Sequence, residues 1–136
     1  GNALLCKKPV DIKWTVAKSL PFASELTFDA RDIKLRRKIM GCLLDVPDFG
    51  KLLLFNVHFC AYCPSSQRQA QINKALKFIK TIRTFVHLFY GYVPCVFGGD
   101  FNIQDVPNES HDAATDEYNL ITGAGFIDAY AETCAF

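Results

Sequence analysis

Short apolar runs bounded by turn residues alternate with one long amphipathic stretch along this chain. Four runs predict buried strands: residues 2–6, 39–46, 52–57 and 93–97. The second and third flank the turn at residues 47–50 (PDFG), where Pro fixes one position and Gly accepts a positive φ, so we predict an antiparallel hairpin. Residues 7–38 are less regular and predict only a short strand at 25–28.

The hydrophobic period changes between residues 67 and 90. Basic side chains lie off an apolar stripe there, which predicts an amphipathic helix capped by Ser65 or Ser66 and ended by Gly91. Residues 115–122 predict a second helix. This order indicates an α/β fold with a mixed sheet, in which reactive residues gather where strands end. The stripe consists of Ile72, Ala75, Leu76, Ile79, Ile82, Val86 and Phe89.

Composition limits the class of protein. The chain has 136 residues, of which 50% are hydrophobic, as expected for one compact domain with a sizeable core. It has no apolar run of membrane-spanning length and no signal peptide, so we expect a soluble chain of undetermined compartment. Because it begins inside a predicted strand, we expect residues 1–136 to be a single partial domain, with an uncovered strand edge that makes the isolated chain aggregate or dimerise.

Charge is distributed unevenly. Residues 1–99 carry all 15 Lys and Arg with 6 acidic residues, whereas residues 100–136 carry 8 acidic residues and no Lys or Arg. This asymmetry is typical either of a cation site beside an anion site or of two regions that pair with each other. Nothing in the sequence indicates a protein partner.

Cys60 and Cys63 form the only recognisable cysteine spacing. A zinc site requires a second Cys or His pair, and a thioredoxin-like motif opens a helix directly after a strand. Neither condition is clearly met, so we expect two loop thiols without a redox or metal role. The other cysteines are Cys6, Cys42, Cys95 and Cys134.

Polar residues follow two of the predicted strands. The third strand ends at His58, and the fourth is followed by Asp100 and Asn102. If the long helix connects neighbouring strands, these side chains converge at one edge of the sheet. An imidazole, a carboxylate and a carboxamide can position water and bind a phosphate oxygen.

Five motifs in order resemble the endonuclease/exonuclease/phosphatase superfamily, which has a DNase I-like fold. They are residues 1–10 (GNALLCKKPV), 52–59 (LLLFNVHF), 68–71 (RQAQ), 99–102 (GDFN) and 125–128 (GFID). The resemblance implies a mixed-sheet α/β fold that is part of a four-layer α/β sandwich. It also implies a Mg²⁺-dependent phosphodiester hydrolase, and within the superfamily the chain most resembles the neutral sphingomyelinase branch.

The resemblance also implies roles for individual residues. His58 would bind the scissile phosphate or assist the leaving group, Asp100 would orient water and contribute an incomplete metal site, and Asn102 would bind a phosphate oxygen. Arg68 and Asp128 would support the site. The metal-binding Glu and the Asp-His pair of the family have no counterpart in this chain, Val57 stands where Thr is usual, and Cys6 where Ser is common. We therefore expect this chain alone to be inactive.

Other functions remain open at this point. Nuclease branches, DNase I-like or of the abasic-site type, share all five motifs, and a diverged member could be an inactive anion-binding module using the basic residues 31–38. The loop after His58 is apolar and the loop after Asn102 lacks Lys and Arg, which favours sphingomyelin or a related phospholipid over DNA. Phe59 and Tyr62 would then make a peripheral membrane contact.

Overall fold

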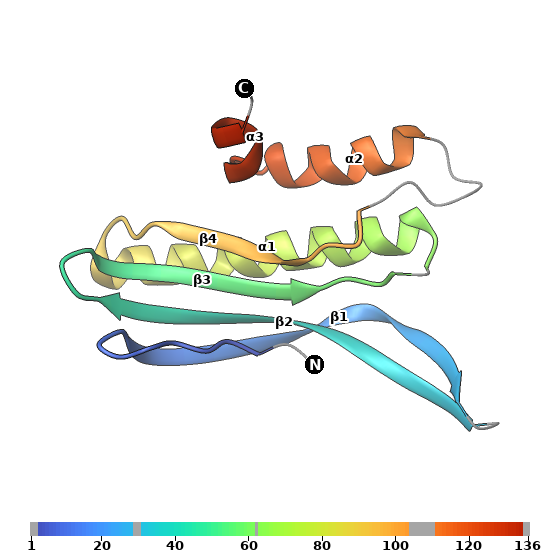
Figure 1. Cartoon of the computed structure of the whole chain (residues 1–136), viewed down its shortest axis with the longest axis horizontal. Coiled ribbons are helices and arrows are strands. Elements are labelled where there is room, and N and C mark those ends of the chain that lie inside the picture. The colour runs from blue at the N-terminus through green and yellow to red at the C-terminus, as the bar shows by residue number, and fades with distance from the viewer. Residues whose placement is uncertain (1–2, 29–30, 62, 104–110, 135–136) are drawn as a thin grey trace.

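The computed structural model describes residues 3–28, 31–61, 63–103 and 111–134, with side chains for 3–21, 37–61, 63–103 and 115–133. One sheet, one long helix and two shorter helices make up this part of the chain (Figure 1). The elements, in chain order, are β1 (Asp11–Phe28), β2 (Arg31–Val46), β3 (Gly50–His58), α1 (Ser65–Tyr90), β4 (Cys95–Asp100), α2 (His111–Thr122) and α3 (Ala129–Cys134).

The sheet is mixed, and its strand order is β1-β2-β3-β4. The first three strands pair antiparallel, whereas β4 pairs parallel with β3. The predicted hairpin is confirmed as β2 and β3. Its turn is closed by the Phe49 amide, which donates to the Val46 carbonyl at 3.1 Å, and Gly50 has the expected positive φ of 96°.

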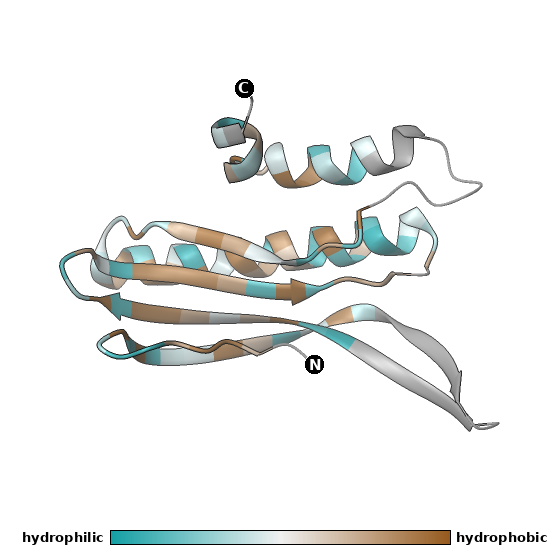
Figure 2. Ribbon diagram, in the orientation of Figure 1, coloured by the Kyte–Doolittle hydropathy of each residue, from teal (hydrophilic) through white to brown (hydrophobic). Residues whose placement is uncertain are grey.

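The core lies between α1 and one face of the sheet. Alternate residues of β3, which are Leu53, Phe55 and Val57, are almost fully buried and face this helix, as the period of two along a strand requires. Helix α1 contributes Ile72, Ala75, Ile79 and Val86. Figure 2 shows the apolar residues concentrated on β2, β3 and β4. Parallel neighbouring strands need a long crossover connection, which explains why one long helix joins β3 to β4.

The predicted strand at residues 2–6 is wrong for the residues that the structure describes. Residues 3–7 have no regular secondary structure. They lie beside β3, where the Asn56 amide donates to the Ala3 carbonyl at 2.9 Å. An apolar run predicts burial, but it forms a strand only when another backbone is available to pair with it. The edge strands among the described residues are β1 and β4, so the aggregation predicted above does not follow from residues 1–6.

The irregular region predicted for residues 7–38 is also wrong. Strands β1 and β2 form a long hairpin that extends beyond the part of the sheet covered by α1 (Figure 1). Pro21 lies between Ser19 and Ala23, where the register between β1 and β2 shifts. Proline has no amide hydrogen to donate, but at such a bulge the amide is not needed for a hydrogen bond between the strands. Pro21 therefore marks a bulge within a strand.

The predicted helices are found with three differences. Helix α1 has no side-chain cap at its N-terminus, because the Ser65 hydroxyl donates elsewhere and Pro64 precedes the first turn. Phe89, a member of the predicted apolar stripe, is 67% exposed. Helix α2 begins four residues earlier than predicted, and α3 was not predicted.

Among the helices in the described part of the chain, none combines the length and the apolar character that crossing a bilayer requires.

Candidate active site

His58 and Asp100 end two adjacent parallel strands, and this register brings their side chains together. His58 pairs with Asp100 across β3 and β4, and the imidazole Nε2 lies 3.5 Å from the carboxylate Oδ2. The two side chains are 37% and 60% exposed, so both are accessible from solvent. This distance is long for a hydrogen bond but places an imidazole next to a carboxylate, as acid–base chemistry requires.

Asn102 lies at the same edge of the sheet and is held by the backbone. Its φ of 49° is a left-handed conformation that Asn tolerates better than most residues. Its side-chain amide donates to the Phe59 carbonyl at 3.0 Å, and its backbone amide donates to Asp100 Oδ1 at 3.1 Å. The predicted trio of His58, Asp100 and Asn102 is therefore brought into one place.

Gly99 allows β4 to approach β3 closely just before Asp100. A Cβ atom at Gly99 would lie 2.0 Å from the Val57 carbonyl oxygen, and the φ of 132° excludes most side chains. Gly98, one residue earlier, has open space around its Cα. Gly99, the glycine of the GDFN motif, is thus required for the geometry of the pair His58 and Asp100.

We expect Gly99→Ala to destabilise the protein by about 3 kcal/mol or more, because the clash with backbone cannot relax without separating β4 from β3. Urea unfolding monitored by circular dichroism measures this change. Gly98→Ala is the matched control and should change stability by less than about 1 kcal/mol. Equal effects of the two substitutions would contradict this explanation.

Arg68 is buried and does not face the trio. It is 1% exposed, and its Nε donates to Glu117 Oε2 of α2 at 2.7 Å. Its Nη1 donates to the carbonyls of Cys60 at 3.4 Å and Cys63 at 3.1 Å, while Ser65 donates to the other Glu117 oxygen at 2.6 Å. Arg68 therefore fixes the loop that follows His58, which is a supporting position. The sequence analysis missed Glu117.

Gln71 fixes the same loop from the next turn of α1. Its side-chain oxygen accepts the Cys60 amide at 3.0 Å, and its nitrogen donates to the Pro21 carbonyl at 3.0 Å. Arg68 and Gln71, the first and last residues of the RQAQ motif, are thus almost fully buried, and both bind backbone carbonyl or amide groups. Polar residues on a helix stripe that is otherwise apolar are the sequence signal for buried side chains that bind backbone groups.

Asp128 immediately precedes α3 and lines a cavity that also contains Asp100 and Asn102. The cavity has a volume of about 880 Å³ and lies between β4 and the two C-terminal helices. The Asp128 Oδ1 accepts the amides of Tyr130 and Ala131 at 2.9 and 3.2 Å, and Tyr118 donates to Oδ2 at 3.1 Å. The bond from the Ala131 amide is the main cause of the lowered pKa of Asp128. These hydrogen bonds therefore hold Asp128 as a carboxylate in the cavity that contains Asp100 and Asn102.

Phe59 is not a membrane-facing residue, which corrects the expectation for the loop after His58. Its side chain is fully buried and stacks on Phe101 with ring centroids 5.9 Å apart. The strand alternation that exposes His58 directs the next residue into the core. Tyr62, the other member of the expected pair, lies outside the described residues.

Cys60 and Cys63 are buried, and Cys63 Sγ donates to the Cys60 carbonyl at 3.6 Å. Burial, followed by the neighbouring Cys60 thiol, raises the pKa of Cys63 to about 12. Redox motifs depend on a lowered thiol pKa, so this environment is opposite to that of a reactive CxxC pair.

We expect Cys63 to react slowly with iodoacetamide at pH 8 in the folded protein and quickly in urea, because the thiolate is the reactive form. Mass spectrometry of timed samples measures the two rates. Because the thiol pKa is higher in the folded state than in the unfolded state, the folded state loses stability as the pH rises above about 9. Rapid labelling of folded protein at pH 8 would show that the thiol is accessible as a thiolate.

Three comparisons place the chain among known proteins. No family model matches it, and no curated protein matches it. Solved structures do match. A mannosyl-6-phosphatase from Bacteroides thetaiotaomicron shares 19% identity at a TM-score of 0.61, over 89% of this chain and 41% of that chain.

Two further structures have similar scores. The human Nocturnin catalytic domain, with a bound sulfate anion, shares 17% identity at a TM-score of 0.58, over 90% of this chain and 39% of that chain. An endonuclease/exonuclease/phosphatase from Beutenbergia cavernae shares 21% identity at a TM-score of 0.62, over 90% of this chain and 29% of that chain.

These matches establish the fold. The chain has the DNase I-like α/β fold of the endonuclease/exonuclease/phosphatase proteins, which confirms the resemblance found in its motifs. It spans between 29% and 41% of the length of the structures named above. The described residues provide one mixed sheet and its helices.

Proposed function

We propose that the whole protein containing this chain is a phosphoester hydrolase, and more narrowly a Mg²⁺-dependent phosphodiesterase. The observation that carries the proposal is the meeting of His58 and Asp100 at the ends of parallel strands, with Asn102 held beside them. Solved structures with the same fold are named as a phosphatase and as endonuclease/exonuclease/phosphatase proteins, which supports hydrolysis of phosphoesters as the general chemistry.

Each member of the trio has a task for which its contacts suit it. The Asn102 amide gives one hydrogen to the Phe59 carbonyl, which fixes the plane of the amide and leaves the second hydrogen for a phosphate oxygen. Asp100 orients the attacking water, and the His58 imidazole donates to the phosphate or to the departing oxygen. Donors fixed in advance stabilise the negative charge that develops on the phosphate oxygens.

Asp100 is suited to contribute one ligand to Mg²⁺. The ion prefers oxygen ligands and is commonly bound through one or two carboxylates, with water and substrate phosphate completing the octahedron. The residues that the structure describes contain no cluster of three or more His, Cys, Asp or Glu side chains. Any further protein ligands would therefore come from outside the described residues. When bound, the ion neutralises charge on the phosphate oxygens.

The lining of the adjacent cavity supports a substrate with a single phosphodiester joined to an apolar group, such as sphingomyelin or a related phospholipid. Asp100 and Asp128 are its carboxylates, and Arg83 is its one cation among the described residues. A polyanion such as DNA requires several Lys or Arg contacts to its phosphates. Phe126 and Ile127 are among the apolar residues available to an acyl or sphingoid chain.

The test is an assay of the whole protein with Mg²⁺ on sphingomyelin vesicles and on plasmid DNA in parallel. We expect cleavage of sphingomyelin that EDTA abolishes, and little activity from residues 1–136 alone, because the remaining metal ligands and the general base are then absent. Nicked plasmid with intact sphingomyelin would identify a nuclease. Failure to cleave either substrate or bis(4-nitrophenyl) phosphate would overturn the proposal and favour an anion-binding module.

A further inference from the structure

The outward face of α1 carries large apolar side chains in its last turns. Phe85, Leu88 and Phe89 are 55%, 76% and 67% exposed, and the ring centroids of Phe85 and Phe89 lie 4.8 Å apart. The helix buries its other face, which includes Ile79 and Val86, in the core beside the sheet. Apolar side chains that gather on one surface mark a contact with a partner, whereas single exposed ones do not.

The same face is basic in the preceding turns. Lys74 and Lys77 are exposed, and they precede Phe85 and Leu88, respectively, by eleven residues. Eleven residues are about three turns of helix, so the lysines and the apolar residues lie on one face. Helix α1 contains no Asp or Glu. Among the ion pairs formed by the described residues, none includes Lys74 or Lys77. The face therefore joins positive charge to apolar surface.

Two threonines between the lysines and the apolar residues bind their hydroxyl groups to the helix itself. Thr81 donates to the Lys77 carbonyl at 2.9 Å, and Thr84 donates to the Lys80 carbonyl at 3.0 Å. A hydroxyl that already donates to a carbonyl loses less when water is removed from it. These threonines thus do not prevent the face from meeting an apolar medium.

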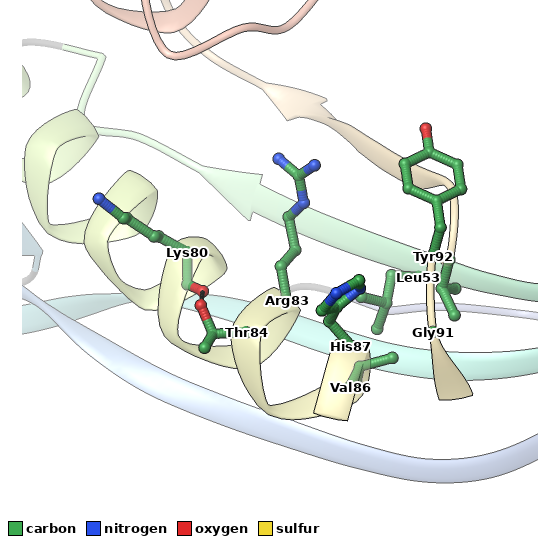
Figure 3. Close-up of a pocket in the computed structure, with 9 residues that line it drawn as sticks. Leu53, Lys80, Arg83, Thr84, Val86, His87, Gly91 and Tyr92 are labelled. Atoms are coloured by element: carbon green, nitrogen blue, oxygen red, sulfur yellow. Dashed lines mark hydrogen bonds between the residues drawn. The ribbon is translucent and has the colours of Figure 1, made fainter. Parts of the chain in front are cut away.

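Arg83 and Tyr92 belong to the substrate cavity and not to this face. Both line the cavity that contains Asp100 and Asn102. Figure 3 shows Arg83 and Tyr92 extending to the same side, whereas the Lys80 side chain points in another direction. The substrate cavity therefore extends from the trio to the last turns of α1. The apolar residues of the outward face are not part of its lining.

Lysines beside exposed apolar side chains suit a bilayer better than a protein or a nucleic acid. Lys is depleted from protein–protein interfaces. Duplex DNA is bound mainly through its phosphates, and Phe85 and Leu88 cannot contribute hydrogen bonds or charge to them. At the surface of a bilayer, apolar side chains enter the boundary of the acyl chains while lysines are attracted to anionic head groups.

We propose that the outward face of α1, formed by Lys74, Lys77, Phe85, Leu88 and Phe89, docks the whole protein on a bilayer that contains anionic phospholipid. The lysines contact the head groups, and the apolar side chains enter the boundary below them. This role goes beyond the proposed hydrolase function, because docking requires no residue of the trio. A docked bilayer would lie beside the substrate cavity, since that cavity extends to the last turns of α1.

The test is cosedimentation of the whole protein with vesicles of phosphatidylcholine and phosphatidylserine. We expect binding that falls as the salt concentration rises and that is weaker with phosphatidylcholine alone. Lys74→Gln/Lys77→Gln should weaken binding about tenfold or more, since each lysine near an anionic surface contributes about fivefold in affinity. Phe85→Gln/Leu88→Gln should weaken it by a similar factor, because two apolar side chains then no longer leave water. Glutamine is a good helix former, so these substitutions preserve α1.

The matched controls are exposed residues outside α1. Lys7→Gln/Lys8→Gln removes the same charge from the N-terminal segment. Ile12→Gln/Tyr130→Gln removes two apolar side chains that are 42% and 77% exposed. Both control variants should leave vesicle binding nearly unchanged. Equal losses in the controls and in the α1 variants would overturn the proposal, as would a wild-type protein that does not bind these vesicles.

Turnover of bis(4-nitrophenyl) phosphate by the same variants separates docking from catalysis. Weakened vesicle binding with unchanged turnover supports docking. Vesicle binding by a wild-type protein that hydrolyses no phosphoester would refute the hydrolase function and leave the docking face standing.

Other occupants of the face give different results, and each of them would overturn the proposal. A dimer that Phe85→Gln/Leu88→Gln dissociates would assign the face to a second copy of the chain. A lower unfolding midpoint of this variant with unchanged vesicle binding would assign it to another part of the whole protein. Binding of duplex DNA that is weakened only by Lys74→Gln/Lys77→Gln, without binding of vesicles, would assign it to nucleic acid.

Discussion

Replacing Glu117 with alanine is expected to destabilise the protein by about 4 kcal/mol, because it leaves a buried guanidinium without its counter-charge. Glu117 and Arg68 are 0% and 1% exposed, and their ion pair is the contact that joins α2 to the start of α1. Water cannot reach Arg68 to replace the lost carboxylate. Urea unfolding of the whole protein, followed by circular dichroism, measures the loss.

Asp116→Ala is the matched control, since it removes the same charge from an exposed position one residue earlier on α2. It should change the free energy of unfolding by less than about 0.5 kcal/mol. Converting the pair to Arg68→Met/Glu117→Leu should recover most of the stability lost in Glu117→Ala, because two apolar side chains need no charge partner. Equal effects of Glu117→Ala and Asp116→Ala would show that the buried ion pair contributes nothing measurable.

The ion pair also connects stability to the candidate active site. Arg68 donates to the carbonyls of Cys60 and Cys63, so its position fixes the chain directly after His58. Asn102 in turn donates to the Phe59 carbonyl. Loosening Arg68 therefore displaces the backbone to which Asn102 is bound, and Glu117→Ala is expected to lower activity even in the fraction of protein that remains folded.

The sequence predicted those elements whose evidence is local. The hairpin of β2 and β3 follows from two apolar runs around one turn, and α1 follows from a period of 3.6 residues sustained over more than twenty residues. The meeting of His58 with Asp100 was also predictable, because a single helix between two strands makes them parallel neighbours. The first two inferences require only residues close together in the chain, and the third requires only the order strand, helix, strand.

The elements that were missed depend on distant partners. Glu117 is 49 residues from Arg68, and an acidic residue in a polar helix looks like any solvent-exposed carboxylate. Arg68 lies on the same face of α1 as the buried Ile72, so a buried counter-charge could be inferred for it. The sequence did not identify the residue that supplies this charge. Residues 3–7 failed as a strand for a related reason, since the partner backbone that a strand needs cannot be recognised from the strand alone.

Asp100→Asn is expected to lower kcat of the whole protein by about 10³-fold on its phosphoester substrate, with a small change in KM. The substitution keeps the shape of the side chain but removes the negative charge beside His58, and a positioned acid–base group typically contributes between about 10² and 10⁴ in rate.

Asp48→Asn is the matched control, because Asp48 lies in the turn at the other end of β3 and its φ of 62° is tolerated by Asn. Steady-state kinetics measure kcat and KM of both variants, and circular dichroism spectra confirm that both are folded. If Asp100→Asn retains nearly full activity while Asp48→Asn behaves as the wild type, the pair of His58 and Asp100 is not the centre of the reaction.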